Sequence, residues 1–266
     1  MDLHLHTYYS DGTSSPGQVM VDTAMLGMNL VAITDHDTTE GFVKAKQVAD
    51  EWGLELMTGV EISTPKYHIL GYNFDIENKP LQDLLAYSRN CQEAIVRQKI
   101  DGLKKMGVPI TYEKVMLVTK SRIGTINMLA AMVRDPECRR YIGSRSAEEI
   151  NRDYLKKVVP EYICPEVTPA DAINAIHAAG GFAILAHPPK DVDEMSELED
   201  LVRLGIDGLE LAPRFGERNA PFKEFAQTHG LKVTYGSDYH GGRRMDRPLL
   251  SRNGNVIDYD ALCLLR

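Results

Sequence analysis

Short apolar segments that alternate with amphipathic helical patterns limit most strongly how this chain can fold. The predicted strands cover residues 2–5, 30–34, 55–60, 67–72, 182–186, 206–211 and 231–236. Between most of them, apolar residues recur three and four positions apart, over 16–28, 39–52, 169–179, 194–204 and 219–228. Ser15-Pro16 and Thr168-Pro169 are typical of helix starts, with an N-cap side chain followed by proline. The alternation predicts an α/β fold in which helices cover a parallel sheet, and seven strands would form an incomplete or distorted barrel.

The segment 79–164 interrupts this alternation. It carries almost only helical patterns, including a long amphipathic run over 80–106 that ends at Gly107. It holds 16 Lys and Arg against 10 Asp and Glu, a net charge of +6, whereas the remainder of the chain has a net charge of −14. All eight histidines lie outside it. We therefore predict a barrel domain formed by 1–78 and 165–266, and a basic helical insertion at 79–164.

Composition excludes several classes of protein. A hydrophobic content of 43% with 26% charged residues is typical of a soluble globular protein and excludes a disordered chain. No apolar run approaches the roughly 20 residues of a membrane span, and no basic-then-apolar leader precedes the first strand. The four cysteines lie far apart and form no CxxC pair, which indicates reduced thiols in a cytoplasmic protein. The net charge of −8 argues against long nucleic acid as a partner.

Polar side chains gather at the ends of the predicted strands. His4 and His6 are two residues apart and so share one strand face. The alternative for them is a remnant of a terminal tag, but tags are runs of histidine and not alternations. The complete set is His4, His6, Asp11, His36, Glu61, His68, His187, Asp238 and His240. A single such residue is often only a cap, whereas a whole set whose strand ends meet at one barrel rim predicts a shared metal centre.

The number and type of these residues suggest the ions. One divalent ion takes about four to six ligands, so nine residues predict two or three ions that share bridging carboxylates. Mixed imidazole and carboxylate ligands favour Mn, Fe or Zn over Mg or Ca. The two remaining histidines, His177 and His229, fall inside predicted helices and are expected to pack or to lie on the surface.

Six short blocks resemble a known family. DLHLHT…SDG, AITDHD, GVE, HILGY, LAHP and GSDYH occur in this order and resemble the motifs of the PHP (polymerase and histidinol phosphatase) family of metal-dependent phosphoesterases. The resemblance covers 1–78 and about 165–266. It is strongest to stand-alone nucleoside 3′,5′-bisphosphate phosphatases and RNA-trimming 5′-to-3′ exonucleases, which carry a helical insertion at this place. It implies a distorted (β/α)7 TIM-like barrel that holds three ions.

The resemblance also implies roles for individual residues. Carried over by motif, His4, His6, Glu61 and Asp238 would hold one ion, Asp11, His36 and His240 a second, and Glu61, His68 and His187 a third. Ions that share a carboxylate ligand lie close enough together to share a hydroxide, which attacks phosphorus in line. Glu61, Asp11 and His36 are therefore the predicted catalytic residues, and water or His36 would protonate the leaving group. Asp2, Asp35 and Asp37 are expected to accept hydrogen bonds from the imidazole N–H groups.

Arginines are the predicted contacts to the substrate. The basic insertion is expected to close over the strand ends as a cap and to present cations, with Arg97 and Arg122 as candidates. Arg122 stands in Ser121-Arg-Ile-Gly124, where family relatives often carry Gly-Arg-Pro-His. Further candidates follow the sixth and seventh predicted strands: Arg214, Arg218, Arg243 and Arg244.

These observations predict hydrolysis of a phosphomonoester of a small nucleotide-like substrate. The alternatives are a 5′-3′ exonuclease acting on short RNA, a histidinol-phosphate-type phosphatase, and a non-catalytic protein that binds nucleotides through metal ions. An amidohydrolase also uses an HxH strand in a barrel, but it usually places a lysine at a strand end. None of the predicted strands ends in lysine.

Overall fold

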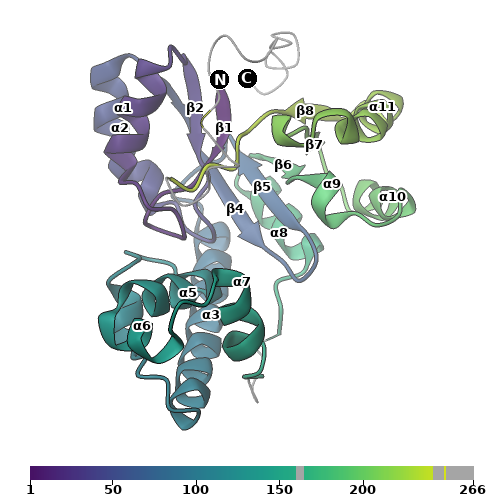
Figure 1. Ribbon diagram of the computed structural model, residues 1–266. Helices are drawn as coiled ribbons and strands as arrows, with labels where there is room; N and C mark the ends of the chain where they lie inside the picture. Colours follow the sequence, from purple (N-terminus) through teal and green to yellow (C-terminus); the bar gives the residue numbers. More distant parts are fainter. Residues whose placement is uncertain (160–164, 242–248, 250–266) are drawn as a thin grey trace.

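The computed structural model describes residues 1–159, 165–241 and 249 (Figure 1). The strands are β1 (Asp2–Leu5), β2 (Leu30–Ile33), β3 (Glu55–Met57), β4 (Gly59–Ser63), β5 (His68–Tyr72), β6 (Phe182–Leu185), β7 (Gly208–Glu210) and β8 (Lys232–Thr234). The helices around them are α1 (Pro16–Met25), α2 (Glu40–Trp52), α8 (Pro169–Ala178), α9 (Pro188–Asp191), α10 (Ser196–Arg203), η2 (Pro213–Asn219) and α11 (Ala220–Thr228). The predicted α/β class is therefore confirmed.

The strands form two sheets. The first is parallel in the order β1-β2-β3, and the second has the order β4-β5-β6-β7-β8. The expectation of a parallel sheet throughout is wrong, because β5 pairs antiparallel with both β4 and β6. Only residues 64–67 join β4 to β5. A connection this short allows a hairpin, whereas parallel neighbours need a crossover of a dozen residues or more.

The strand predicted at 55–60 is two strands that belong to different sheets. β3 pairs with β2, whereas β4 pairs with β5, and the break falls at Thr58. Gly59 permits this break, because a Cβ atom at this position would lie 2.7 Å from the carbonyl oxygen of Ile33. The chain therefore crosses from one sheet to the other with its backbone in close contact with β2.

Hydrogen bonds join the two sheets at two places. On one side, Leu3 N donates to the carbonyl oxygen of Tyr235 (3.1 Å) and His6 N to that of Tyr239 (2.8 Å). On the other side, Asp37 N donates to the carbonyl oxygen of Glu61 (2.9 Å), and His36 forms an isolated parallel bridge with Glu61. These two seams bring residues from both ends of the chain to one edge of the strands.

Helix caps and apolar packing stabilise this arrangement. Ser15 accepts a hydrogen bond from Gln18 N, and Thr168 forms a capping box with Asp171, so both predicted N-caps are confirmed. The largest core cluster packs α8 and α11 against β4 to β7 and includes Ile69, Ile176 and Phe222. A second cluster packs α1 and α2 against β1 and β2.

The segment between β5 and α8 is helical, as predicted. It contains α3 (Lys79–Lys105), α4 (Tyr112–Met116), α5 (Thr125–Arg134), α6 (Pro136–Ile142), α7 (Ala147–Ile150) and the π-helical turn η1 (Asn151–Leu155). Gly107 follows the end of α3 with a positive φ of 87°. These helices share a core of their own around Ile100, Met128 and Ile142, and Figure 1 shows α5, α6 and α7 gathered beside the far part of α3, away from the sheets. Residues 160–164 of the predicted insertion lie outside the described residues.

Within the described ranges, none of the helices combines the length and the hydrophobicity that crossing a membrane requires.

Candidate metal centre

His4 and His6 project from β1 toward the same point in the interior. Their Nε2 atoms lie 3.1 Å apart, and they lie 3.2 and 3.1 Å from Oε2 of Glu61 on β4. Asp238, which follows β8, places its Oδ1 atom 3.4 Å from Nε2 of His6 and 3.7 Å from Nε2 of His4. All four side chains are buried.

The spacing of these four atoms fits a metal ion. A tetrahedral shell with metal–ligand distances of about 2.0–2.2 Å places its ligand atoms roughly 3.4 Å apart. Two imidazole nitrogens and two carboxylate oxygens separated by 3.1 to 3.7 Å have this spacing. This donor set suits a divalent transition metal.

A second group of donors adjoins the first. Oδ1 of Asp11 lies 3.2 Å from Nε2 of His240 and 3.7 Å from Nδ1 of His6. The ligand atoms of His6, Asp11, His36 and His240 all lie within 4.8 Å of one another. The predicted trio of Asp11, His36 and His240 is therefore together in space, and His6 lies within reach of both groups.

Glu61 connects these donors to a third group. Its Oε2 atom faces His4, His6 and, at 3.3 Å, Nδ1 of His36. Its Oε1 atom faces Nδ1 of His68 at 2.8 Å and Nε2 of His187 at 3.2 Å. One carboxylate thus presents its two oxygens to two sets of imidazoles, which is the arrangement of a bridging ligand. All nine residues proposed from the sequence therefore meet at one place.

Charge is balanced within the cluster by the imidazoles. Burial would raise the pKa of Glu61, but the facing rings of His36, His4 and His68 hold it well below its ordinary value. Burial would lower the pKa of His4, but the carboxylates of Glu210, Glu61 and Asp238 raise it well above its ordinary value. The rings of His4 and His6, whose pKa values are raised, supply part of the positive charge that the buried carboxylates require, whereas burial holds the pKa of His36 well below its ordinary value. A divalent cation would supply this charge in their place.

The backbone is constrained at several of these positions. Asp37, His187 and Asp238 have positive φ angles of 55°, 32° and 56°, a region that side chains other than glycine rarely adopt. Asp37 follows His36 directly, and the other two are donor residues themselves. Such conformations persist where the surrounding contacts determine them, and they concentrate at functional sites.

Two acidic residues that the sequence did not single out orient the imidazoles. Oε1 of Glu210 on β7 lies 2.8 Å from Nδ1 of His4, and its Oε2 accepts a hydrogen bond from His187 N at 2.8 Å. Oδ2 of Asp191 lies 2.7 Å from Nδ1 of His187. A carboxylate in the apolar stretch Leu209-Glu210-Leu211 was the signal that could have identified Glu210.

The acids expected to contact imidazoles accept hydrogen bonds from backbone amides and from hydroxyl groups. Asp35 accepts hydrogen bonds from Thr7 N (2.7 Å), Thr7 Oγ1 (2.6 Å) and Ser10 Oγ (2.6 Å), so it fixes the loop that carries Asp11. Asp2 accepts from Ser237 N at 2.9 Å. Asp37 accepts from Ser63 N at 2.9 Å.

Three of the six arginines proposed as substrate contacts have different environments. Arg122, which is 9% exposed, lies with Nε 3.3 Å from Oδ2 of Asp37 and donates to Ser63 Oγ. Nη2 of Arg214 lies 2.9 Å from Oδ2 of Asp238, so this arginine orients that carboxylate. Arg97 is not brought to the site: it is half exposed, pairs with Glu93 one helical turn away on α3, and stacks over Tyr112.

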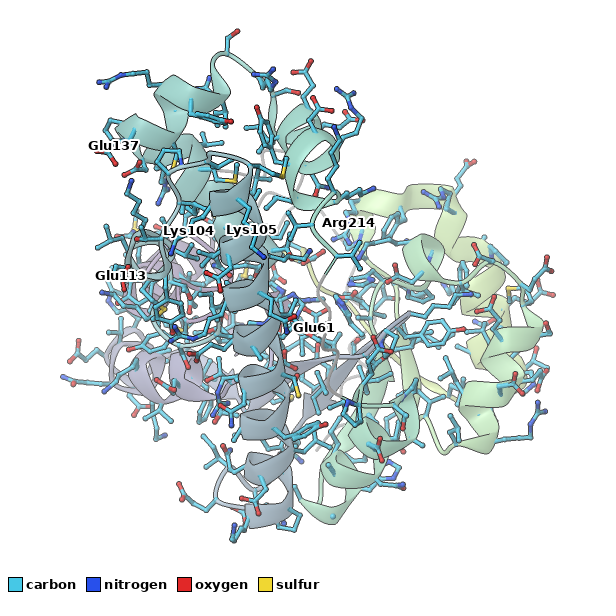
Figure 2. All side chains as sticks on the ribbon, turned by 90° about the horizontal axis from the view of Figure 1, so that it is seen from below. Glu61, Lys104, Lys105, Glu113, Glu137 and Arg214 are labelled. Carbon is cyan, nitrogen blue, oxygen red and sulfur yellow. The ribbon has the colours of Figure 1, made fainter. Side chains whose placement is uncertain are left out.

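Three further residues named from the sequence, Arg218, His177 and His229, pair with groups outside this set of donors. Arg218 donates to the carbonyl oxygen of Pro189. His177 pairs with Asp207 and His229 with Glu199. Arg243 and Arg244 lie outside the described residues. Figure 2, seen from below, labels Glu61 and Arg214 toward the middle of the molecule and Lys104 and Lys105 on α3.

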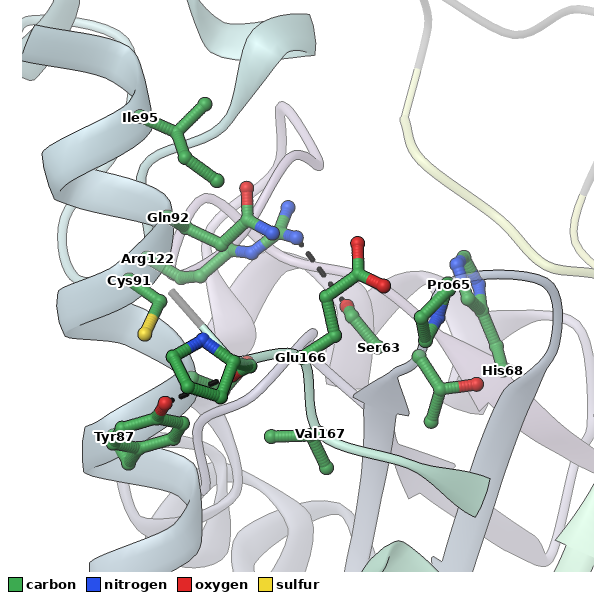
Figure 3. Close-up of a pocket in the computed structure, with 13 residues that line it drawn as sticks. Ser63, Pro65, His68, Tyr87, Cys91, Gln92, Ile95, Arg122, Glu166 and Val167 are labelled. Carbon is green, nitrogen blue, oxygen red and sulfur yellow. Dashed lines mark hydrogen bonds between the residues drawn. The ribbon is translucent and has the colours of Figure 1, made fainter. Parts of the chain in front are cut away.

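Two adjoining cavities give access to the centre. The central cavity, of about 340 Å³, is lined by Asp11, His36, Glu61, His68, Gln92, Arg122, Thr125, Ile126, His187, Lys190, Asp238 and His240. The side cavity, of about 300 Å³, is lined by Ser63, Thr64, Pro65, His68, Tyr87, Ser88, Cys91, Gln92, Ile95, Arg122, Pro165, Glu166 and Val167 (Figure 3). His68, Gln92 and Arg122 belong to both linings, so the two cavities meet at these side chains.

Known proteins resemble the chain over most of its length. A 5′-3′ exoribonuclease from Haemophilus influenzae is 30% identical over 90% of this chain and 89% of its own length. A phosphoribosyl 1,2-cyclic phosphate 1,2-diphosphodiesterase from Eggerthella lenta is 29% identical over 90% of this chain and 94% of its own length. A 3′,5′-nucleoside bisphosphate phosphatase from Chromobacterium violaceum is 27% identical over 91% of this chain and 89% of its own length.

Solved structures share the fold. A protein from Bifidobacterium adolescentis described as a metal-dependent phosphoesterase superposes with a TM-score of 0.83 at 27% identity, over 99% of this chain and 94% of its own. A protein from Chromobacterium violaceum described as an amidohydrolase has a TM-score of 0.78 at 28% identity, over 91% of this chain and 88% of its own.

The three named relatives are all hydrolases that act on phosphoric ester bonds, and this confirms the class of enzyme predicted from the sequence. The family model for the PHP domain matches residues 2–201. The chain therefore belongs to the PHP domain family of metal-dependent phosphoesterases.

Proposed function

We propose that the protein hydrolyses a phosphomonoester of a small nucleotide-like substrate, with divalent metal ions held at the centre built around Glu61. The observation that carries this proposal is the pair of contacts made by the two oxygens of Glu61. Oε2 lies 3.1 Å from Nε2 of His6, and Oε1 lies 2.8 Å from Nδ1 of His68. A carboxylate in this position can bind two metal ions at once. Enzymes that hydrolyse phosphoesters commonly use such neighbouring metal ions.

We assign the donors to three sets that would hold three ions of Mn, Fe or Zn. They are His4, His6, Glu61 and Asp238; Asp11, His36 and His240; and Glu61, His68 and His187. When bound, such ions lower the pKa of water toward about 7, supply a hydroxide nucleophile and neutralise phosphoryl oxygens in the transition state.

Residues of the chain position the substrate at this centre. Arg122 and Lys190 line the central cavity and would attract the phosphoryl group. The guanidinium of Arg122 is fixed by Asp37 and Ser63, so its direction is set before the substrate arrives. Glu61, Asp11 and His36 would act directly at the reacting group, since all three side chains line the same cavity.

The helical segment 79–164 is proposed to act as the substrate cap. Gln92, Arg122, Thr125 and Ile126 come from this segment and line the central cavity together with the imidazoles. The hydrogen bonds between the two sheets support a distorted (β/α)7 barrel under this cap. They join β1 to the segment after β8, and β4 to the segment after β2. The free thiols of Cys91 and Cys138 are compatible with the proposed cytoplasmic location.

A phosphate-release screen with Mn tests the proposal. The substrates are p-nitrophenyl phosphate, nucleoside 3′- and 5′-monophosphates, a nucleoside 3′,5′-bisphosphate and a 5′-phosphorylated oligoribonucleotide, all at fixed salt. We expect turnover of the small phosphomonoesters, and we expect Glu61→Ala to abolish it and to reduce the metal content measured by inductively coupled plasma mass spectrometry. Glu77→Ala, at an exposed position that lines neither cavity, is the matched control.

Two outcomes would contradict the proposal. Turnover of the oligoribonucleotide alone would favour the 5′-3′ exoribonuclease activity for which the Haemophilus relative is named. A protein that binds nucleotides but releases no phosphate from any substrate would instead be a non-catalytic binding protein.

A further inference from the structure

The side cavity differs in charge from the central cavity. Its lining contains one arginine, Arg122, and this guanidinium already faces the buried carboxylate of Asp37 at 3.3 Å. Its lining also contains one carboxylate, Glu166. Figure 3 shows the Glu166 side chain extending into the cavity toward Ser63 and Arg122. Among the described residues, Glu166 has no hydrogen-bond or ion-pair partner.

The position of Glu166 is set by a contact between two segments of the chain. Glu166 lies two residues before Thr168, the N-cap of α8. The preceding residue, Pro165, accepts a hydrogen bond through its carbonyl oxygen from the hydroxyl of Tyr87 on α3 at 2.8 Å. This contact ties the backbone next to Glu166 to α3, the helix that contributes Tyr87, Gln92 and Ile95 to the lining of the same cavity.

The rest of the lining combines apolar faces with a polar edge. Apolar surface comes from Pro65, Tyr87, Ile95, Pro165 and Val167, and hydroxyl and amide groups come from Ser63, Thr64, Ser88 and Gln92. Such a lining suits a flat group that has apolar faces and a hydrogen-bonding rim. A volume of about 300 Å³ is at the small end of the range for ligand sites, so the group must be small.

We propose that the side cavity receives the leaving group of the phosphomonoester, that this group is an uncharged nucleoside, and that Glu166 selects against substrates that carry a second phosphate. The proposal rests on the proposed function, because it places the scissile phosphate in the central cavity. The carboxylate of Glu166 accepts hydrogen bonds from hydroxyl or amino groups of a nucleoside. It repels a phosphate on that nucleoside, because like charges brought together at a binding site cost affinity.

Relative turnover of monophosphorylated and bisphosphorylated substrates tests this proposal. The Mn-loaded full-length protein is assayed with adenosine 3′-monophosphate, adenosine 5′-monophosphate and adenosine 3′,5′-bisphosphate, and kcat/KM is measured for each. We expect the better monophosphate to exceed the bisphosphate by about tenfold or more. Glu166→Lys should reverse this preference. Glu166→Gln should give a ratio of kcat/KM values between those of the wild type and Glu166→Lys. Glu77→Lys makes the same change of charge at an exposed position outside both cavities and should leave the ratio unchanged.

Product inhibition supplies a second measurement. Adenosine should compete with the substrate, and Glu166→Lys should strengthen inhibition by adenosine 5′-monophosphate while weakening inhibition by adenosine. Thermal unfolding checks that each variant is folded, which is expected because Glu166 is exposed.

The outcomes separate this inference from the proposed function. A wild-type protein that prefers the bisphosphate, or a Glu166→Lys variant that keeps activity with an unchanged ratio, overturns the role of Glu166. Hydrolysis of p-nitrophenyl phosphate without hydrolysis of any adenosine phosphate overturns the nucleoside assignment but leaves the phosphomonoesterase intact. Absence of turnover on every substrate overturns the proposed function itself.

Discussion

The Nδ1 atom of His4 lies 2.8 Å from Oε1 of Glu210, and both side chains are fully buried. This contact directs Nε2 of His4 toward Glu61 and Asp238, because the ring nitrogen that faces a carboxylate carries the proton. The other oxygen of Glu210 accepts the hydrogen bond from His187 N. One residue on β7 therefore orients donors on two sides of the centre.

Replacement of Glu210 is expected to weaken metal binding without removing a ligand. Glu210→Gln keeps the size of the side chain but loses the charge that holds the His4 ring. The expected result is a loss of about 10- to 100-fold in metal affinity, measured by competition with a chelator. Glu224→Gln on the exposed surface of α11 is the control. Equal affinities in the two variants would contradict the role given to Glu210.

Replacement of Arg122 is expected to destabilise the fold. Asp37 is fully buried beside Arg122, so Arg122→Met leaves an ionised group in the interior without its cation. We expect a decrease of about 3 kcal/mol in the free energy of unfolding, measured with urea. Adding Asp37→Asn to the Arg122→Met variant should restore part of the lost free energy of unfolding. Arg97→Met, whose salt bridge with Glu93 is exposed, should leave the free energy of unfolding nearly unchanged.

The free energy of unfolding should depend on pH through Glu197. Hydrogen bonds from Lys66 and Tyr67 lower the pKa of Glu197 from 4.5 to about 2. The ionised carboxylate therefore stabilises the fold above about pH 4.5, and this contribution disappears as the pH falls from 4.5 through about 2. Since the pair lies near solvent, Glu197→Gln should cost about 1 kcal/mol or less at pH 7.

Urea titrations of the metal-free wild type and of Glu197→Gln at pH 7, 5 and 3 check this expectation. The difference between the two proteins should be largest at pH 7 and should shrink toward pH 3. A difference that grows as the pH falls would show that the contact does not stabilise the ionised form of Glu197.

A side chain at Gly236 should disturb the centre through the backbone. A Cβ atom here would lie 2.2 Å from Cβ of His4 and 2.7 Å from Oε1 of Glu210. Gly236→Ala should therefore displace β1, lower the free energy of unfolding by about 1–3 kcal/mol and reduce metal content. Gly17→Ala on α1 is the matched control, because its Cβ would meet only Val48 at 3.4 Å and should leave stability unchanged or raised. Equal stabilities of the two variants would contradict the close packing of Gly236 against His4.

Local patterns identified much of this protein correctly. The periodicity of apolar residues predicts α1, α2, α3, α8, α10 and α11, and the N-caps at Ser15 and Thr168 are readable from two residues each. The short motifs identified every member of the cluster around Glu61. These features depend on neighbours in the sequence, so they are visible without the fold.

Tertiary structure decided how the strands pair and which groups face the donors. The split of 55–60 at Thr58 and the antiparallel pairing of β5 follow from hydrogen bonds to strands elsewhere in the chain, and a period of two residues is the same in either sheet. Glu210 meets His4 across 206 positions, and Arg214 meets Asp238 because η2 and the end of β8 lie together. The sequence alone therefore predicted which side chains gather around Glu61, whereas contacts between distant segments determined which charged groups orient them. The physical reason is that electrostatic energy depends on distance in space and not on separation along the chain.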